Sequence, residues 1–239
     1  MLELKNVSYV VEDGNEQKAI LSDISLQINE RFVAVTGPNG GGKSSLAKII
    51  AGIIKPTSGK IFFEGTDITE LGITERANLG ISFAFQQPVR FKGLTVYDLL
   101  RISAGKKLLV GEACDYLSQV GMCARDYIKR EVNASLSGGE LKRIEIATLL
   151  ARSTKLSIFD EPEAGIDLWS FTNLIEVFKH MNDAINGNIL IISHQERILE
   201  IADKIVVIAA GKLTDIGSKD EIMPSLMTPS GSCGRIVAV

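Results

Sequence analysis

The chain has 239 residues, of which 45% are hydrophobic and 23% are charged. Its 26 basic and 29 acidic side chains give a formal charge of -3, which excludes a protein that binds nucleic acid by bulk electrostatics. No run approaches the roughly 20 apolar residues of a membrane span, and the first residues lack a signal-peptide pattern. We therefore expect a cytoplasmic chain without direct membrane insertion. Three cysteines, whose spacing fits neither a zinc site nor a disulfide framework, agree with a reduced compartment: Cys114, Cys123 and Cys233.

Apolar runs typical of buried strands alternate with helical segments along most of the chain. We expect strands at residues 31–36, 61–64, 81–85, 156–159, 189–193 and 204–209. Helical spacing of apolar residues predicts a helix over 170–185, and the alternation indicates a parallel sheet covered by helices. Residues 95–151 show helical periodicity without a strand, which predicts a helical lobe inserted into an α/β core. Near the end, residues 218–221 form a capping-box pattern that predicts a short helix stopping near Pro224, with a flexible segment over 228–234.

A glycine-rich segment follows the first of these strands and precedes a helical stretch that runs to Ala51. It fits the pattern G-x-x-x-x-G-K-[ST], in which backbone amides and a helix N-terminus surround phosphates. Lys43 would neutralise the β and γ phosphates, and the Ser44 hydroxyl would bind Mg²⁺. The motif predicts a nucleoside triphosphate site but does not choose between a kinase, a GTPase and an ATPase. Its residues are Gly37, Pro38, Asn39, Gly40, Gly41, Gly42, Lys43, Ser44 and Ser45.

Two acidic residues, Asp160 and Glu161, end the apolar run at 156–159. Because parallel strands place their carboxyl ends at one edge of a sheet, Asp160 is expected to face the phosphate loop and to interact with Mg²⁺. Glu161 is then the carboxylate that polarises the attacking water. Taken alone, the pair could equally be two acids that solvate a strand end. Combined with the phosphate loop, it favours a catalytic pair.

The string Leu136-Ser137-Gly138-Gly139-Glu140 precedes a helical run. Glycine amides, the Ser137 hydroxyl and the helix dipole make a second anion site, and the same residues fit a capping box in which Ser137 and Glu140 satisfy each other's amides. Both interpretations can hold at once. The string, about twenty residues before Asp160, resembles the signature motif of ATP-binding cassette (ABC) ATPases, and the resemblance extends over residues 2–223.

The resemblance implies further roles. Gln86 corresponds to the Q-loop glutamine that senses the metal, and Asp167 is the terminal acid of a D-loop at residues 163–167. His194 corresponds to the switch histidine that contacts the γ-phosphate, so Glu161, His194 and Gln86 are the implied catalytic residues. Such ATPases bind Mg²⁺ and ATP and close head to tail, so that residues 137–140 and Asp167 of one copy meet the nucleotide on the phosphate loop of a second copy. The metal residues would be Ser44, Gln86 and Asp160.

The resemblance also predicts an organisation. It implies a P-loop NTPase of ABC type in a single ATPase domain over residues 1–239, with an N-terminal antiparallel β portion beside a mostly parallel sheet. Residues 1–86 and 152–223 would form the α/β core, residues 87–151 the inserted helical subdomain with the signature motif, and residues 224–239 a C-terminal tail.

Three strings favour one branch of the family. Residues 84–89 (AFQQPV), 138–143 (GGELKR) and 194–199 (HQERIL) resemble SufC, an ATPase of iron-sulfur cluster assembly, and so does the lack of an adenine-stacking ring at Val11. This resemblance implies a SufB/SufD-like scaffold as partner, docked on the surface of residues 86–101. The alternative is a transporter subunit that receives a membrane permease at the same surface, because Asp160-Glu161-Pro162 has the transporter form. Cys233 could touch a metal on a partner, but an incidental thiol is the simpler interpretation.

Overall fold

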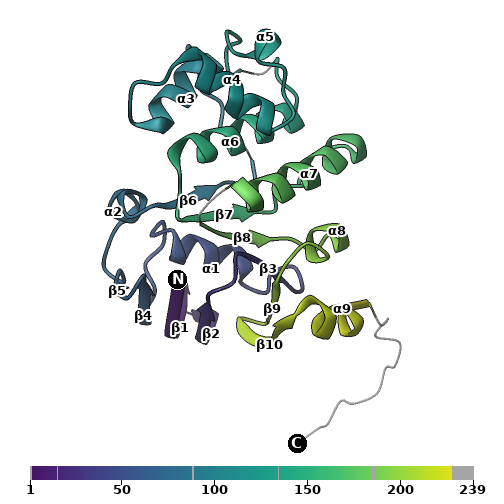
Figure 1. The fold of residues 1–239 in the computed structure, drawn as a ribbon. Helices are drawn as coiled ribbons and strands as arrows, with labels where there is room; N and C mark the ends of the chain where they lie inside the picture. Colours follow the sequence, from purple (N-terminus) through teal and green to yellow (C-terminus); the bar gives the residue numbers. More distant parts are fainter. Residues whose placement is uncertain (1, 15, 88, 134, 185–186, 228–239) are drawn as a thin grey trace, which may run out of the picture.

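Two sheets form the framework of the fold in the computed structural model (Figure 1), which describes residues 2–14, 16–87, 89–133, 135–184 and 187–227. The larger sheet has the order β10-β9-β3-β8-β7-β6, and all of its strands except β10 run parallel. The runs expected at 31–36, 156–159, 189–193 and 204–209 lie in this sheet at nearly the predicted positions. A fifth expected run, at 81–85, forms its edge strand β6. The strands are β3 (Phe32–Thr36), β6 (Ile81–Ala84), β7 (Leu156–Asp160), β8 (Asn188–Ile192), β9 (Lys204–Ala209) and β10 (Lys212–Ser218).

The smaller sheet is the N-terminal antiparallel portion that the family resemblance implies. Its order is β2-β1-β4-β5, built from β1 (Leu2–Asp13), β2 (Glu16–Ile28), β4 (Ser58–Phe63) and β5 (Thr66–Asp67). The run expected as a strand at 61–64 is β4, so it belongs here and not to the parallel sheet. Register shifts interrupt the pairing of β1 with both neighbours.

Alternate residues of the parallel strands enter two different cores. In β3, Val33 and Val35 pack with α1 (Lys43–Ile50) and the smaller sheet, whereas Phe32 and Ala34 pack with the helices on the opposite face. This alternation is the period of two of a strand with both faces buried. Burial of both faces holds each parallel strand in place, and the strand in turn sets where the loop after it begins.

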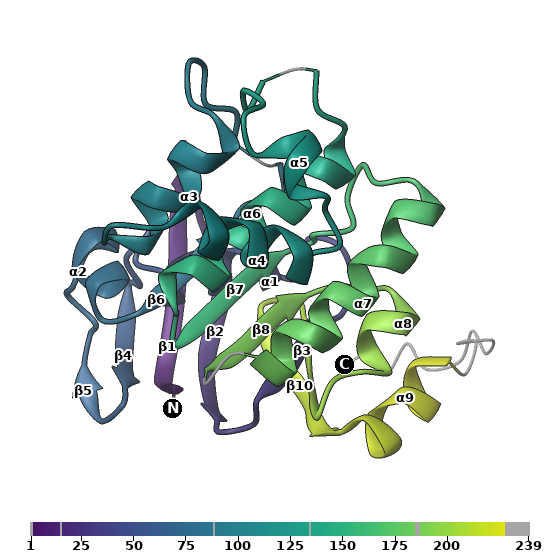
Figure 2. The same cartoon turned by 45° about the horizontal axis from the view of Figure 1, so that its top comes forward.

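The helices cover both faces of the larger sheet, and several gather beyond β6 and β7 (Figures 1 and 2). Helices α3 and α4 pack on α6, as expected for residues 95–151, where the described residues add only an isolated bridge between Thr95 and Glu131. None of the helices in the described ranges is both long and apolar enough to cross a membrane. Besides α1 they are α2 (Ile73–Asn78), α3 (Val96–Ala104), α4 (Val110–Gln119), α5 (Ala124–Tyr127), α6 (Gly138–Arg152), α7 (Leu168–Ala184), α8 (Glu196–Leu199) and α9 (Lys219–Met227).

The helix after Gly217 starts as expected but does not stop near Pro224. Its capping box forms, since the Ser218 amide donates to Glu221 Oε2 at 2.8 Å. Pro224 then lies inside α9, which continues to Met227. The ring of proline fixes a φ close to the helical value, but it removes the hydrogen bond to the carbonyl four residues earlier and crowds that carbonyl, so α9 continues for only three residues beyond it. The predicted flexible segment at 228–234, Cys233 and the rest of the tail lie outside the described residues.

Candidate functional site

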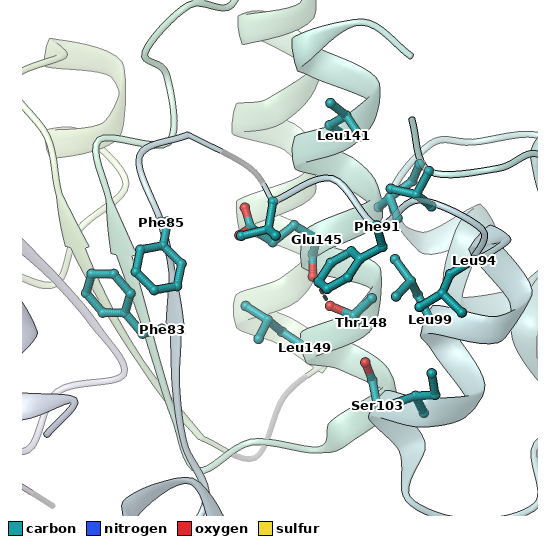
Figure 3. A pocket seen from close by; sticks show the side chains of 14 residues that line it. Phe83, Phe85, Phe91, Leu94, Leu99, Ser103, Leu141, Glu145, Thr148 and Leu149 are labelled. Carbon is teal, nitrogen blue, oxygen red and sulfur yellow. Dashed lines mark hydrogen bonds between the residues drawn. The ribbon is translucent and has the colours of Figure 1, made fainter. Parts of the chain in front are cut away.

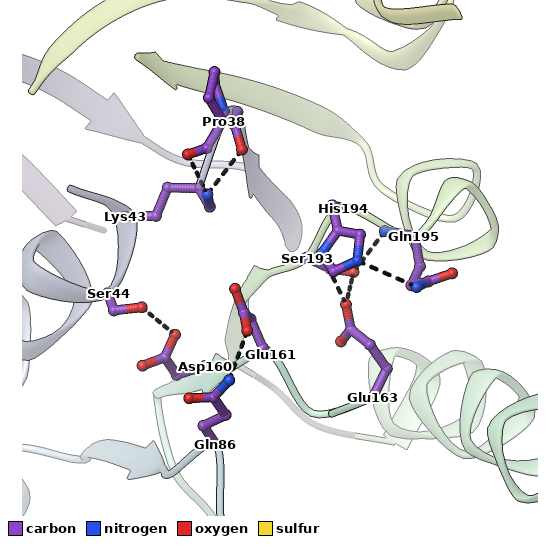
Figure 4. A network of polar contacts seen from close by, with 11 residues as sticks. Pro38, Lys43, Ser44, Gln86, Asp160, Glu161, Glu163, Ser193, His194 and Gln195 are labelled. Atoms are coloured by element: carbon purple, nitrogen blue, oxygen red, sulfur yellow. Dashed lines mark hydrogen bonds and ion pairs between the residues drawn. The ribbon is translucent and has the colours of Figure 1, made fainter. Parts of the chain in front are cut away.

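Four parallel strands deliver the predicted site residues to one edge of the larger sheet. The phosphate loop follows β3, Gln86 follows β6, Asp160 ends β7 with Glu161 after it, and His194 follows β8. Figure 4 shows these side chains facing a common region. Ligand sites of open α/β sheets form at the carboxyl ends of the strands, so the topology gathers residues from four distant parts of the chain.

The glycines of the phosphate loop are required by close backbone contacts. A Cβ atom at Gly37, whose φ is 129°, would lie 2.1 Å from the carbonyl oxygen of Ile208 on β9. At Gly42, whose φ is 101°, it would lie 2.7 Å from Leu21 Cδ2 on β2. A side chain at either position would push the loop away from its neighbouring strand. The loop is therefore held against β2 and β9 in its curved form.

Lys43 closes this loop from inside. Its ammonium donates to the carbonyl oxygens of Gly37 at 2.8 Å and Pro38 at 2.9 Å, and the residue is only 6% exposed. These carbonyls supply partial negative charge but no full counter-charge. A triphosphate at the loop would offer the ammonium a stronger partner. The loop is thus curved by its own lysine before a ligand arrives.

A cavity of about 490 Å³ lies over the phosphate loop and the start of α1. Gly42 caps α1 without a side-chain hydrogen bond, so the first amides of the helix are available to an anion. The sequence reasoning missed Lys18 and Ile20, which β2 contributes to the cavity wall. No motif marks them, because they reach the site only through the pairing of β2 in the smaller sheet. The remaining wall is formed by residues 39–45 and Glu161.

Ser44 and Asp160 lie together as the sequence predicted. The Ser44 hydroxyl donates to Asp160 Oδ1 at 2.8 Å, and Asp160 is 5% exposed. One hydroxyl and one carboxylate are the few oxygen donors that proteins offer to a magnesium ion shared with phosphates. The donor chemistry therefore fits Mg²⁺, although the described residues contain no group of three or more His, Cys, Asp or Glu that could hold a metal without phosphate oxygens.

Gln86 and Glu161 also meet. Gln86 Nε2 donates to Glu161 Oε2 at 2.7 Å, although 75 residues separate them. Glu161 has a φ of 45°, a left-handed value that is uncommon for a residue with a side chain and is often found at functional sites. Its amide donates to the carbonyl of Ile192 on β8, which helps to hold this conformation. The carboxylate lines the phosphate-loop cavity, where the sequence places the base.

The signature residues form the predicted capping box at the start of α6. The Ser137 amide donates to Glu140 Oε2 at 2.6 Å, and the Glu140 amide donates to Ser137 Oγ at 3.2 Å. Tyr127 donates its hydroxyl proton to Glu140 Oε1 at 2.5 Å, and Arg130 lies 3.8 Å away. Burial acts to raise the pKa of Glu140, but the hydrogen bonds from Tyr127 and Ser137 outweigh it and lower that pKa. The carboxylate is therefore committed to holding the loop.

The signature loop packs on the D-loop of the same chain and not on the phosphate loop. A Cβ at Gly139 would lie 2.9 Å from Ser170 Cβ, and one at Gly138 would lie 3.3 Å from the carbonyl oxygen of Gly165. Asp167 accepts a hydrogen bond from the Ser170 amide at 3.0 Å. Ser137 and Gly138 are exposed, and the described residues around the phosphate-loop cavity include neither. Within the described residues of one chain, the signature loop and the phosphate-loop cavity are therefore separate.

His194 is largely exposed and lies beside a buried carboxylate. Its Nδ1 is 4.0 Å from Glu163 Oε1, and its side chain is 58% exposed against 7% for Glu163. Glu163 Oε1 also accepts the Ser193 hydroxyl at 2.5 Å. Burial raises the pKa of Glu163 above its usual range, the charge of Glu161 acts in the same direction, and Ser193 and His194 oppose them. The sequence reasoning placed residue 163 in the D-loop but gave it no role.

Comparisons with known proteins identify the family of the chain. Residues 21–164 match the family model described as ABC transporter. The chain is 37% identical over 233 residues to an uncharacterized ABC transporter ATP-binding protein of Methanocaldococcus jannaschii, covering 94% of this chain and 92% of that protein. It is 36% identical over 215 residues to the probable ATP-dependent transporter ycf16 of Cyanidium caldarium, covering 83% and 84%.

A solved structure supports the same assignment. The fold matches that of cbiO1 from Clostridium perfringens, described as part of the ABC transporter complex cbiONQ, with a TM-score of 0.78 and 26% identity. The match covers 94% of this chain and 91% of that one. The expected P-loop NTPase fold of ABC type is confirmed. The chain therefore belongs to the ABC transporter family, and it is an ATP-binding ATPase subunit of that family.

Proposed function

We propose that two copies of this chain close head to tail around Mg²⁺ and ATP, hydrolyse the nucleotide, and thereby change the conformation of a SufB/SufD-like scaffold. The observation that supports the proposal is that the signature residues lie apart from the phosphate-loop cluster within one chain. The phosphate loop, Asp160 and Glu161 gather at one place, whereas Ser137 and Gly138 lie exposed at another. A second copy would bring the missing half to each nucleotide. In this arrangement residues 1–86 and 152–223 act as the core, and residues 87–151 carry the signature face.

Each residue of the cluster has a task in this chemistry. Lys43 would exchange the carbonyls of Gly37 and Pro38 for phosphate oxygens. Ser44 and Asp160 would hold Mg²⁺, with Gln86 nearby, and the ion would neutralise phosphate charge when bound. Glu161 would orient the attacking water once Gln86 releases its carboxylate, and His194 would contact the γ-phosphate.

The variant Glu161→Gln tests the dimer. It removes the charge of the proposed base but keeps its shape, so ATP should still bind while turnover falls by at least about 100-fold. The trapped state should be a dimer by light scattering with Mg²⁺ and ATP. The double variant Glu161→Gln/Lys43→Ala is the control and should remain monomeric, because it lacks the phosphate-binding ammonium. If Glu161→Gln is found exclusively as a monomer at saturating nucleotide, the head-to-tail proposal is refuted.

An apolar pocket next to Gln86 supports a protein partner. It has a volume of about 320 Å³ and lies between β6, the segment after it, α3 and α6 (Figure 3). Phe85 and Phe91 remain 40% and 41% exposed there, and Leu99 and Leu141 form part of the wall. Large apolar side chains left open around a hollow are typical of protein contact sites. Part of its wall, at Val89, Phe91, Leu94 and Leu99, belongs to the surface of residues 86–101 that the SufC resemblance assigns to the scaffold, and the rest comes from β6, from Phe85 and from residues beyond 101.

A membrane permease is the second candidate partner, because the similar proteins named above include transporter ATP-binding proteins. Capture of partners with the tagged chain, followed by separation of soluble and detergent-solubilised fractions, distinguishes the two. A soluble scaffold of the SufB/SufD type supports our proposal, and a permease found only after detergent treatment contradicts it. Phe91→Asp should abolish capture, whereas Leu109→Asp, which changes an exposed leucine outside the pocket, should not.

A further inference from the structure

Glu163 is a buried carboxylate for which the chemistry above gives no task. One oxygen, Oε1, accepts the Ser193 hydroxyl. The other, Oε2, is buried without a hydrogen-bond partner among the described residues. A buried carboxylate oxygen without a partner is costly, and buried groups of this kind are retained where they act on a neighbour. The neighbour here is His194, which follows Ser193 directly.

The two ring nitrogens of His194 face different neighbours. Gln195 Nε2 lies 3.4 Å from His194 Nε2. The donor in this contact depends on which ring nitrogen carries the proton, and a proton at Nδ1 would leave Nε2 free to accept. Nδ1 faces Glu163 Oε1 at 4.0 Å, so a proton there would be directed toward the carboxylate, as Figure 4 shows for the two side chains. Ser193 donates its hydroxyl to the same carboxylate oxygen, Oε1.

We propose that Glu163 is a positioning residue for His194. Held by Ser193, its carboxylate keeps the Nδ1 proton on the protein side and reserves Nε2 for the nucleotide, with Gln195 as the partner of Nε2 until the nucleotide binds. The other carboxylate near Glu163 is that of Glu161, which repels it and does not reach the ring through any described contact. The inference rests on the proposed contact between His194 and the γ-phosphate.

The chain suits a direct test, because it contains only two histidines. Nitrogen-15 NMR of histidine-labelled full-length protein reports which ring nitrogen carries the proton. His180, exposed on α7, serves as an internal reference, and His194→Ala assigns the signals. In the wild type, His194 should show a protonated Nδ1. In Glu163→Gln, its two nitrogen shifts should move toward the mixture of tautomers found in a free imidazole, while the signals of His180 stay unchanged.

Activity gives the second readout. Glu163→Gln should lower kcat by about 10-fold while KM for ATP changes by less than about 2-fold, because a carboxylate that orients a histidine acts on the reacting geometry. Glu163→Asp should recover part of both readouts. Ser193→Ala, which leaves both partners of the pair in place, should shift the His194 signals in the same direction but less. Glu176→Gln, an exposed carboxylate on α7, should match the wild type.

The outcomes separate this inference from the proposed function. Unchanged His194 signals in Glu163→Gln, or an unchanged kcat, overturn the positioning role of Glu163. A His194→Ala variant that hydrolyses ATP at the wild-type rate overturns the proposed role of His194 itself, whatever the spectra show. Thermal unfolding of each variant verifies that the comparison is made between folded proteins.

Discussion

Removing the guanidinium of Arg76 should destabilise the protein, although Arg76 does not line the phosphate-loop cavity. Arg76 is 1% exposed. The four hydrogen bonds that its guanidinium donates in the described structure all go to backbone carbonyls. Two of them, at Ile49 and Ile50, end the helix that starts with Lys43. The partial negative charge of a helix C-terminus favours a cation at this place. The acceptor distances are 2.6 Å for Ile49, 2.9 Å for Ile50, 3.0 Å for Thr69 and 2.9 Å for Leu71.

The structure sets the size of the effect. In Arg76→Met the apolar stem is retained and the four hydrogen bonds are lost. The Ile49 carbonyl still accepts the Gly52 amide at 3.1 Å. The substitution therefore leaves the other three carbonyls without the donor that Arg76 provided. A buried carbonyl left unsatisfied costs about 1–3 kcal/mol, and because the hydrogen bonds at Thr69 and Leu71 are only part-buried we expect about 3–6 kcal/mol for the three. Burial disfavours the guanidinium and lowers the pKa of Arg76, and relief of that burial offsets part of the loss. We expect a net decrease of about 3 kcal/mol in the free energy of unfolding.

Urea unfolding of the nucleotide-free protein measures this decrease by linear extrapolation. Arg152→Met is the matched control, because Arg152 is exposed and makes its hydrogen bond to the carbonyl of Ala77 at 2.9 Å. Its effect should stay within about 0.5 kcal/mol. An Arg76→Met protein as stable as the Arg152→Met control would refute the reasoning, since it would mean that the buried carbonyls find other donors without cost.

Two further predictions concern charge. Lys43→Ala should weaken ATP binding by at least about 100-fold, measured by titration calorimetry, because no other described ammonium donates to the carbonyls of Gly37 and Pro38; an unchanged affinity would mean that the loop does not bind phosphate. Asp67 has a pKa lowered from 3.8 to about 2, chiefly by hydrogen bonds from Thr69 and then from Lys60. Its contribution to stability is present above pH 3.8 and is lost as the pH falls toward 2, so the stability difference between the wild type and Asp67→Asn should shrink over that interval in urea titrations, and a constant difference would contradict the assignment.

The strands of the parallel sheet and the phosphate loop could be predicted because their signals are local. Continuous apolar runs mark β3, β7, β8 and β9, and the loop pattern follows β3 directly. The individual strands β1 and β2 were not predicted, since the first part of β2 is exposed and register shifts break its pairing with β1. The position of β4 in the smaller sheet depends on that pairing as well.

The contacts within the site were less predictable than its members. Motifs identified Gln86 and Glu161 separately, but only the fold shows that one restrains the other across 75 residues. Glu163 and Lys142 were missed as buried groups, because an isolated charged residue normally indicates an exposed position. Glu163 accepts a hydrogen bond from Ser193, and Lys142 donates one to the carbonyl of Phe85. Both partners lie far away in the sequence. Pro224 shows the opposite error: proline usually ends a helix, which led us to expect a stop near this residue, but α9 continues past it to Met227.

Lys142 gives the fold a mechanical property. The side chain is 2% exposed, and its ammonium donates to the Phe85 carbonyl and lies 3.0 Å from Glu145 Oε2. Phe85 immediately precedes Gln86, whereas Lys142 belongs to the first turns of the helix that Ser137 caps. The Lys142 ammonium thus joins the segment that carries Gln86 directly to the helix that follows the signature loop. We expect a displacement of α6 to be transmitted to Gln86 through this contact, because only one hydrogen bond and one peptide unit separate Lys142 from that glutamine.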